Sequence, residues 1–168
     1  MKILNIESRE KYLDIQLSAQ NKIDYCKFSY HDAQKYLKII SDDIDKTNSQ
    51  KKLGPILSLG TRSGREINLF RIALNSSRLF RLVVSLLEIN RKGVNSLIPF
   101  IENLNHSDYT KINHKSSIGI ELSPLAKRAD TWIGSFDEIP DFFNQKFSIV
   151  YSNSFDHCMN PHKTASIW

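Results

Sequence analysis

A short apolar run that ends in a glycine turn constrains this chain more than any other feature of its sequence. Residues 55–59 read Pro-Ile-Leu-Ser-Leu and residues 60–64 read Gly-Thr-Arg-Ser-Gly, and apolar positions then recur from Arg65 onward. A continuously apolar run of this length is typical of a parallel strand that is covered on both faces. The sequence therefore predicts a strand, a tight turn and a helix, which together form one βα unit.

Three further segments have the pattern of strands. They cover residues 117–121, 132–134 and 146–152, and the acidic Glu121 ends the first of them. Near the end of the chain, Asn160 and Pro161 are suited to the N-cap and first residue of a helix. We expect an α/β fold with a Rossmann-like, partial parallel sheet of about four strands and helices on both faces.

Two segments extend this pattern. Residues 1–52 are polar with one helical pattern at 31–44, and we interpret them as an N-terminal extension to a Rossmann-like domain at 53–168. The helix after the glycine turn is broken at residues 75–77, and apolar helical patterns follow at 79–90 and 96–105. We therefore expect residues 75–116 to form a helical insertion that packs over or beside the ligand crevice.

Composition excludes several classes of protein. The two cysteines, Cys26 and Cys158, make no disulfide framework, and no Cys/His set has the spacing of a zinc site, so we expect no metal. The first residues carry charge too early for a secretory signal, and the longest apolar stretch is far short of the ~20 residues of a membrane span. We expect a cytoplasmic protein without a membrane span.

The formal net charge of +5 has two interpretations. Basic residues gather after the glycine turn, at Arg71, Arg78, Arg81, Arg91 and Lys92. They could receive an anionic substrate or a nucleic acid, but a solvated helix face is the more common meaning of such a pattern. No aromatic RNA-recognition motif is visible, so the sequence disfavours a nucleic-acid partner.

Polar features follow three of the predicted strands in a fixed order. The glycine turn follows the first strand, Glu121 ends the second, and a polar cluster from Asn153 ends the fourth. The carboxyl ends of parallel strands meet at one edge of a sheet, where ligands bind. Glycines let the backbone approach a ligand, and a carboxylate can accept both hydroxyls of a ribose. The pattern suits a nucleoside-containing ligand.

These residues resemble the motifs of class I S-adenosylmethionine-dependent methyltransferases, in a branch like the type 11 methyltransferases. Residues 56–66 resemble the first motif, in the form Leu-Gly-Ala-Arg-x-Gly-x-Glu. Residues 118–124 resemble the second, Val-Gly-Ile-Asp-Leu-x-Pro, and residues 134–140 resemble the segment beside adenine. Residues 147–157 resemble the fourth, Phe-Asp-Val-Val-Tyr-Ser-Asn-Ser-x-Asp-His.

The resemblance implies roles for the matched positions. The turn would admit the methionine part of S-adenosylmethionine, Glu121 would hold the ribose, and the loop after the third strand would edge the adenine. The cofactor-binding candidates are Gly60, Thr61, Arg62, Gly64, Glu121, Leu122, Ser135, Phe136, Asn153 and Ser154. Asp156 and His157 are the catalytic candidates, since a histidine titrates near neutrality; a structural histidine in a strand-end turn is the alternative.

Departures from the family leave three hypotheses open. Ser58 and Ser135 stand where relatives have carboxylates near the ligand, and the family's sheet has more strands than these four. The first hypothesis is a methyltransferase acting on a small-molecule, glycan or lipid acceptor. The second is a non-catalytic, S-adenosylmethionine-binding or assembly module, and the third is a dinucleotide-binding protein, which Arg62 disfavours because it interrupts Gly-x-Gly-x-x-Gly.

The fourth predicted strand also suggests a partner. It is apolar, and nothing after it in the sequence has the pattern of a further strand. A strand at the edge of a sheet presents unpaired backbone groups, which recruit other strands. We therefore expect the chain either to form a homodimer through this edge or to be marginally stable. We also expect it to transfer methyl groups poorly.

Overall fold

The structure is a computed structural model of the chain. It describes residues 8, 10–11, 14–15, 18, 28–47, 52–61, 64–75, 77–88, 112–113, 116–123, 128, 130–135, 137–155, 158 and 160–168. Its elements follow the order α2 (Tyr30–Lys46), β1 (Ile56–Leu59), α3 (Arg65–Asn75), α4 (Arg78–Glu88), β2 (Ser117–Glu121), β3 (Thr131–Ile133), the 3-10 helix η4 (Asp141–Phe143), β4 (Ile149–Ser152) and α7 (Pro161–Ile167).

Four parallel strands form the sheet in the order β3-β2-β1-β4. Leu57 of β1 lies opposite Ile118 of β2 on one side and Val150 of β4 on the other. The chain therefore builds outward from β1 to β3 and then returns to the other side of β1. This arrangement confirms the predicted Rossmann-like parallel sheet, and it puts the topological switch point between β1 and β4.

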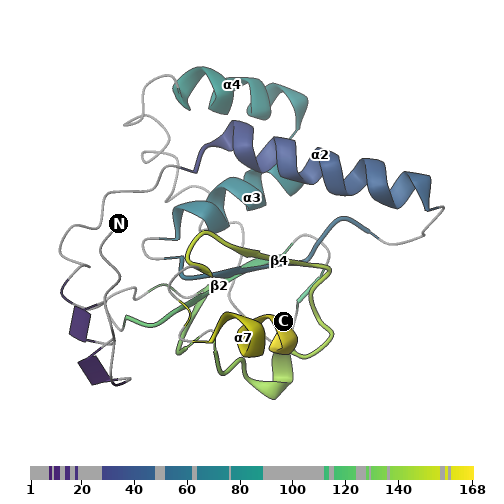
Figure 1. The fold of residues 1–168 in the computed structure, drawn as a ribbon. Helices are drawn as coiled ribbons and strands as arrows, with labels where there is room; N and C mark the ends of the chain where they lie inside the picture. Colours follow the sequence, from purple (N-terminus) through teal and green to yellow (C-terminus); the bar gives the residue numbers. More distant parts are fainter. Residues whose placement is uncertain are drawn as a thin grey trace, which may run out of the picture.

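Helices cover both faces of the sheet, as the sequence predicts. Helices α2 and α3 lie on one face and α7 lies on the other (Figure 1). Helix α4 lies beyond α2 and α3, away from the sheet (Figure 1). It is the described helix of the predicted insertion. Residues 89–111, with the helix predicted at 96–105, lie outside the described residues.

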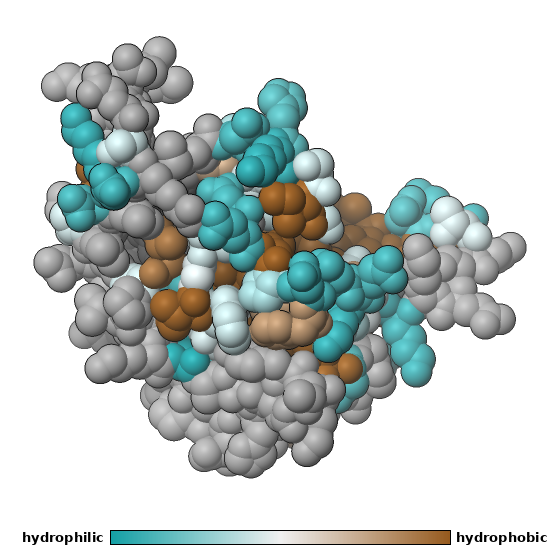
Figure 2. Space-filling view, turned by 90° about the horizontal axis from the view of Figure 1, so that it is seen from below, coloured by the Kyte–Doolittle hydropathy of each residue, from teal (hydrophilic) through white to brown (hydrophobic). Residues whose placement is uncertain are grey.

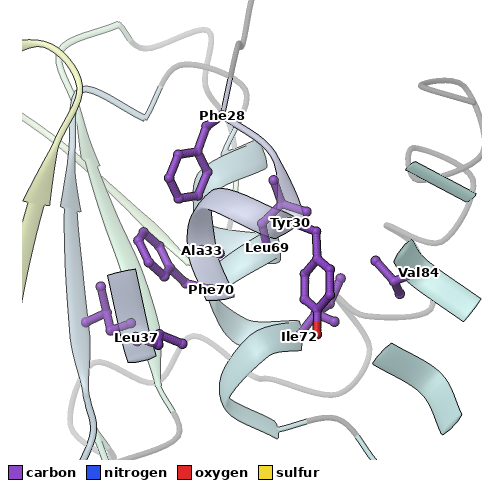
Figure 3. Packing of buried hydrophobic residues seen from close by; sticks show 9 residues of the cluster. Phe28, Tyr30, Ala33, Leu37, Leu69, Phe70, Ile72 and Val84 are labelled. Carbon is purple, nitrogen blue, oxygen red and sulfur yellow. The ribbon is translucent and has the colours of Figure 1, made fainter. Parts of the chain in front are cut away.

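The core between the sheet and α2–α4 is largely aromatic and aliphatic (Figure 3). Phe28 packs between Phe70 of α3 and Tyr151 of β4, with ring centroids 5.1 and 4.9 Å apart. Val84 of α4 belongs to the same cluster and is fully buried. The alternation of a strand sends its other side chains to the opposite face, where Leu57 and Ile118 pack with Phe143.

The outer surface of that second face, which carries α7, mixes hydrophobic and hydrophilic residues (Figure 2). Phe142, Phe155 and Ile167 are about two-fifths exposed. Trp168 stacks edge-on against Phe155 at a centroid distance of 5.2 Å, and this contact helps to hold the end of α7. Among the described residues, no helix has the length and apolar character needed to cross a bilayer.

Capping residues explain where the helices begin. Ser29 accepts a hydrogen bond from the amide of Asp32, whose carboxylate accepts one from the amide of Ser29, so a capping box precedes α2. The additional hydrogen bond from the Ser29 hydroxyl lowers the pKa of Asp32 below its usual value. Asn160 caps α7 by accepting from the amide of Lys163, which confirms the helix predicted from Asn160 and Pro161.

Strand β4 is shorter than the sequence suggests. The predicted strand covers 146–152, but the ladder with β1 begins at Ile149. The reason lies in β1, because Pro55 has no N–H with which to continue the ladder. Its carbonyl instead accepts from the amides of Ser148 and Ile149, and the Ser148 hydroxyl donates to the carbonyl of Gly54.

Candidate functional site

The candidate site lies along the carboxyl edge of the sheet, which we define as the segments that directly follow the four strands. Gly60, Thr61 and Gly64 follow β1, Leu122 and Ser123 follow Glu121 of β2, Ser135 follows β3, and Asn153 and Ser154 follow β4. Because the strands are all parallel, these segments share one edge. Four candidates, Arg62, Phe136, Asp156 and His157, lie outside the described residues.

The glycine turn depends on backbone conformations that only glycine adopts easily. Gly60 and Gly64 have φ of 71° and 73°. The amide of Gly60 donates to the carbonyl of Ile120 at 2.8 Å, which ties the turn to β2, and the amide of Gly64 donates to Thr61 at 2.7 Å. The first helical hydrogen bond is from Asn68 to Gly64, so the turn passes directly into α3.

Arg128 packs directly on the Gly64 backbone. A Cβ atom at Gly64 would lie 2.4 Å from the Arg128 Nε atom, closer than real Cβ contacts. The guanidinium donates to Asn68 Oδ1 at 2.9 Å and makes two bonds with the Asp130 carboxylate, at 2.9 and 2.8 Å. Gly64 is therefore required both by its φ and by a charged side chain that occupies the space of a Cβ.

A buried ion-pair network fixes this arginine. Arg71 of α3 lies 2.9 Å from Asp130 and also donates to the carbonyl of Ser117 at 2.8 Å. Burial alone would raise the pKa of Asp130, but the hydrogen bonds and charges of Arg128 and Arg71 outweigh it, so this pKa lies below its usual value. The network links α3 to the start of β2 and β3 and keeps Arg128 against the turn.

Small residues allow α3 to approach the sheet closely. Ser58, Gly119 and Thr131 lie side by side on neighbouring strands. A Cβ at Gly119 would lie 2.4 Å from Ile67 Cδ1 and 2.8 Å from Thr61 Oγ1, so α3 and the turn fill the space above this glycine. Thr61 is accordingly buried, and its hydroxyl is directed at Gly119. Ser58 is fully buried, as part of the packing between helix and sheet.

Glu121 is buried at the end of β2. It is 7% exposed, and its Oε1 atom accepts a hydrogen bond from the amide of Ser123 at 3.2 Å. Its own carbonyl accepts from the amide of Gly134, which aligns the segment after β3 with the end of β2. Leu122 beside it is half-buried. The end of β2 is thus tied to the glycine turn through its backbone, since the carbonyl of Ile120, the residue before Glu121, accepts from the amide of Gly60.

A hydrogen bond connects the segments after β1 and β4, across the switch point. Asn153 donates from its Nδ2 atom to Oε1 of Glu66, a buried residue in the first turn of α3, at 2.6 Å. The Asn153 Oδ1 atom accepts from the Ser154 hydroxyl at 3.0 Å. The Ser152 hydroxyl donates to the carbonyl of Leu59 at 3.3 Å and accepts from the amide of Ser154.

Sequence reasoning assigned no role to Glu66. The motif Leu-Gly-Thr-Arg-Ser-Gly-Arg-Glu contains it, and an acid in the first turn of a helix already satisfies the helix dipole. Its partner stands 87 residues away, so no local pattern connects the two. The signal available in the sequence was the presence of an acid in the first motif together with an amide after the fourth strand.

The segment after β3 is held by helix α7, which lies on the face of the sheet opposite to α2 and α3 (Figure 1). The Ser135 hydroxyl accepts from the amide of Asp137 at 3.1 Å, which closes a small turn. The Thr164 hydroxyl of α7, fully buried, donates to Oδ1 of Asp137. Helix α7 therefore positions the loop that the sequence predicted to edge an adenine, and neither Asp137 nor Thr164 was a sequence-based candidate.

A cavity of about 460 Å³ lies at a different place. Its lining comes from the second half of α2 and the start of β4, with Ile40, Ile44, Leu53 and Ile149 as the apolar part. This is the amino edge of the sheet, opposite the candidate site, because Ile149 begins its strand. The described residues include no cluster of three or more metal-ligating side chains.

Comparisons with known proteins do not identify a relative. No family model matches the chain, and neither the curated proteins nor the solved structures include a match.

Proposed function

We propose that this chain binds S-adenosylmethionine at the carboxyl edge and transfers its methyl group to a small-molecule, glycan or lipid acceptor. The observation that carries the proposal is that the glycine turn after β1, beside the switch point, is hydrogen-bonded through Gly60 to the end of β2, where the buried Glu121 lies. Parallel α/β sheets bind nucleoside ligands at this place. The motif order described above selects the adenosylmethionine cofactor among such ligands.

The residues present suit the parts of this cofactor. The turn at Gly60 and Gly64 offers close backbone approach for the methionine part, and the Glu121 carboxylate suits two ribose hydroxyls. Ser135 and Phe136 would edge the adenine, and Asn153 and Ser154 would line the methyl-donor side. When bound, the cofactor supplies a methyl group on a sulfonium centre.

The protein's contribution to such a transfer is chiefly orientation. Methyl transfer is a direct displacement, so holding the acceptor in line contributes more than proton abstraction when the acceptor is already nucleophilic. Where the acceptor must lose a proton, His157 with Asp156 is the candidate base. A dependence of turnover on a group that titrates near neutrality, lost in His157→Gln, would distinguish the base from a structural histidine.

A non-catalytic cofactor-binding or assembly module is the second candidate. The observation in its favour is Ser58, which replaces a family carboxylate and is fully buried beneath α3. A buried hydroxyl at this position offers the cofactor no counter-charge. A methyl-release assay over a panel of small-molecule, glycan and lipid acceptors separates the two candidates, since a binding module would retain affinity without turnover.

Calorimetric titration with S-adenosylhomocysteine tests the shared part of both candidates. Glu121→Ala should weaken binding by about 1–3 kcal/mol, because a hydrogen-bond acceptor for the ribose is lost. Asp42→Ala is a control for the loss of an acid, because Asp42 is exposed in the second half of α2, away from the carboxyl edge. Binding of NAD in place of S-adenosylhomocysteine would support the dinucleotide hypothesis instead, and unchanged affinity in a folded Glu121→Ala variant would remove Glu121 from the site.

A further inference from the structure

We propose that Glu66 is a positioning residue for the cofactor site, acting through the side chain of Asn153. This inference rests on the proposed function. It adds a residue that makes no direct contact with the ligand but fixes one that does. The juxtaposition that carries it is the 2.6 Å hydrogen bond from Asn153 Nδ2 to Glu66 Oε1.

The two residues differ in environment. Glu66 is 3% exposed, whereas Asn153 belongs to the exposed residues at the carboxyl edge. The amide of an exposed asparagine therefore reaches inward to a buried carboxylate. The 2.6 Å separation puts the Asn153 amide in direct hydrogen-bond contact with the Glu66 carboxyl group.

The amide is also held at its other end. Its Oδ1 atom accepts from the Ser154 hydroxyl, while the Ser154 amide donates to the Ser152 hydroxyl. With donor and acceptor both engaged, the amide plane has one orientation, because a flipped amide would place its oxygen against the Glu66 carboxylate. Asn153 thus presents one defined set of remaining donor and acceptor directions to a ligand.

The location gives this orientation a consequence. Glu66 belongs to the first turn of α3, directly after the glycine turn, and Asn153 follows β4. The bond therefore spans the switch point at which the proposed cofactor sits between β1 and β4. A binding site reaches its full affinity when neighbouring residues hold the ligand-contacting side chains in one orientation. Glu66 performs this function for Asn153.

An exchange of the two functional groups tests the inference. Asn153→Asp puts two carboxylates side by side, and Glu66→Gln in that background restores a hydrogen bond with donor and acceptor reversed. Affinity for S-adenosylhomocysteine and melting temperature are measured for the wild type, the two single variants and the double variant. Asn144→Asp, at an exposed asparagine on the amino side of β4, controls for the added charge.

We expect Asn153→Asp to weaken binding about tenfold or more, and Glu66→Gln to weaken it several-fold on its own. Adding Glu66→Gln to Asn153→Asp should then recover most of the lost affinity, whereas Asn144→Asp should leave affinity unchanged. A purely structural role would move melting temperatures but not the dissociation constant of the folded protein, and that result overturns the inference alone. A folded wild type that binds no S-adenosylhomocysteine overturns the proposed function and this inference with it.

Discussion

Gly64→Ala tests how the turn after β1 depends on Arg128. An L-residue at the Gly64 φ of 73° costs about 1–2 kcal/mol in backbone strain. The new Cβ would also lie 2.4 Å from Arg128 Nε, so the guanidinium must move away from Asp130 and Asn68. Losing one charged hydrogen bond costs about 1.5–3 kcal/mol. We therefore expect a total loss of about 2.5–5 kcal/mol in the free energy of unfolding.

The two contributions separate in an Arg128→Ala background. Without the guanidinium the clash disappears, so Gly64→Ala should then cost only the backbone strain of about 1–2 kcal/mol. Urea unfolding of the wild type, both single variants and the double variant gives the four free energies. Equal costs of Gly64→Ala in both backgrounds would refute the reasoning, because they would show that Arg128 does not occupy the space of the missing Cβ.

Three further predictions concern the scaffold. The pKa of Asp130 is lower in the folded than in the unfolded protein, so the ionised carboxylate adds stability above the unfolded pKa, and this stability is lost as the pH falls through the folded pKa. Urea unfolding from about pH 6 to about pH 3 should show this loss, and Asp130→Asn should reduce the dependence of the unfolding free energy on pH. Thr164→Val removes the hydroxyl that donates to Asp137 and should lower the free energy of unfolding by about 1–2 kcal/mol in thermal melts. Ser166→Ala, at an exposed position of the same helix, is the control and should lower it by less than about 0.5 kcal/mol. Phe70→Ala should cost about 3–5 kcal/mol, since the ring is 1% exposed and contacts Phe28; a loss below about 1 kcal/mol would contradict the packing of that core.

The local part of the fold could be read from the sequence with good accuracy. The strand predicted at 117–121 matches β2, and the predicted start of a helix at Arg65 matches α3. Both elements carry signals within a few residues: an apolar run closed by an acid, and a glycine turn followed by helical periodicity. The predicted start of β4 was wrong because the ladder between β4 and β1 depends on Pro55, a residue about ninety positions earlier in the chain.

The candidate site likewise has one part that the sequence predicts and another that only the tertiary structure shows. The sequence alone brings the glycine turn and Glu121 to one edge, since parallel strands align their carboxyl ends. It does not reveal that Thr61 is buried against Gly119, or that Ser58 lies beneath α3. These positions depend on how closely a helix approaches the sheet, which is set by side chains from three strands together.

What the sequence by itself determined about this protein is therefore its periodicities and its turns, from which a parallel sheet follows whose strands share one carboxyl edge. The tertiary structure alone decided the pairings across the chain: Glu66 with Asn153, Arg128 with Gly64, and Asp137 with Thr164 of α7. Backbone conformation is dictated by neighbours along the chain, so it leaves a local pattern. A hydrogen bond between distant side chains forms only where packing brings two polar groups within about 3 Å, and no local pattern records that distance.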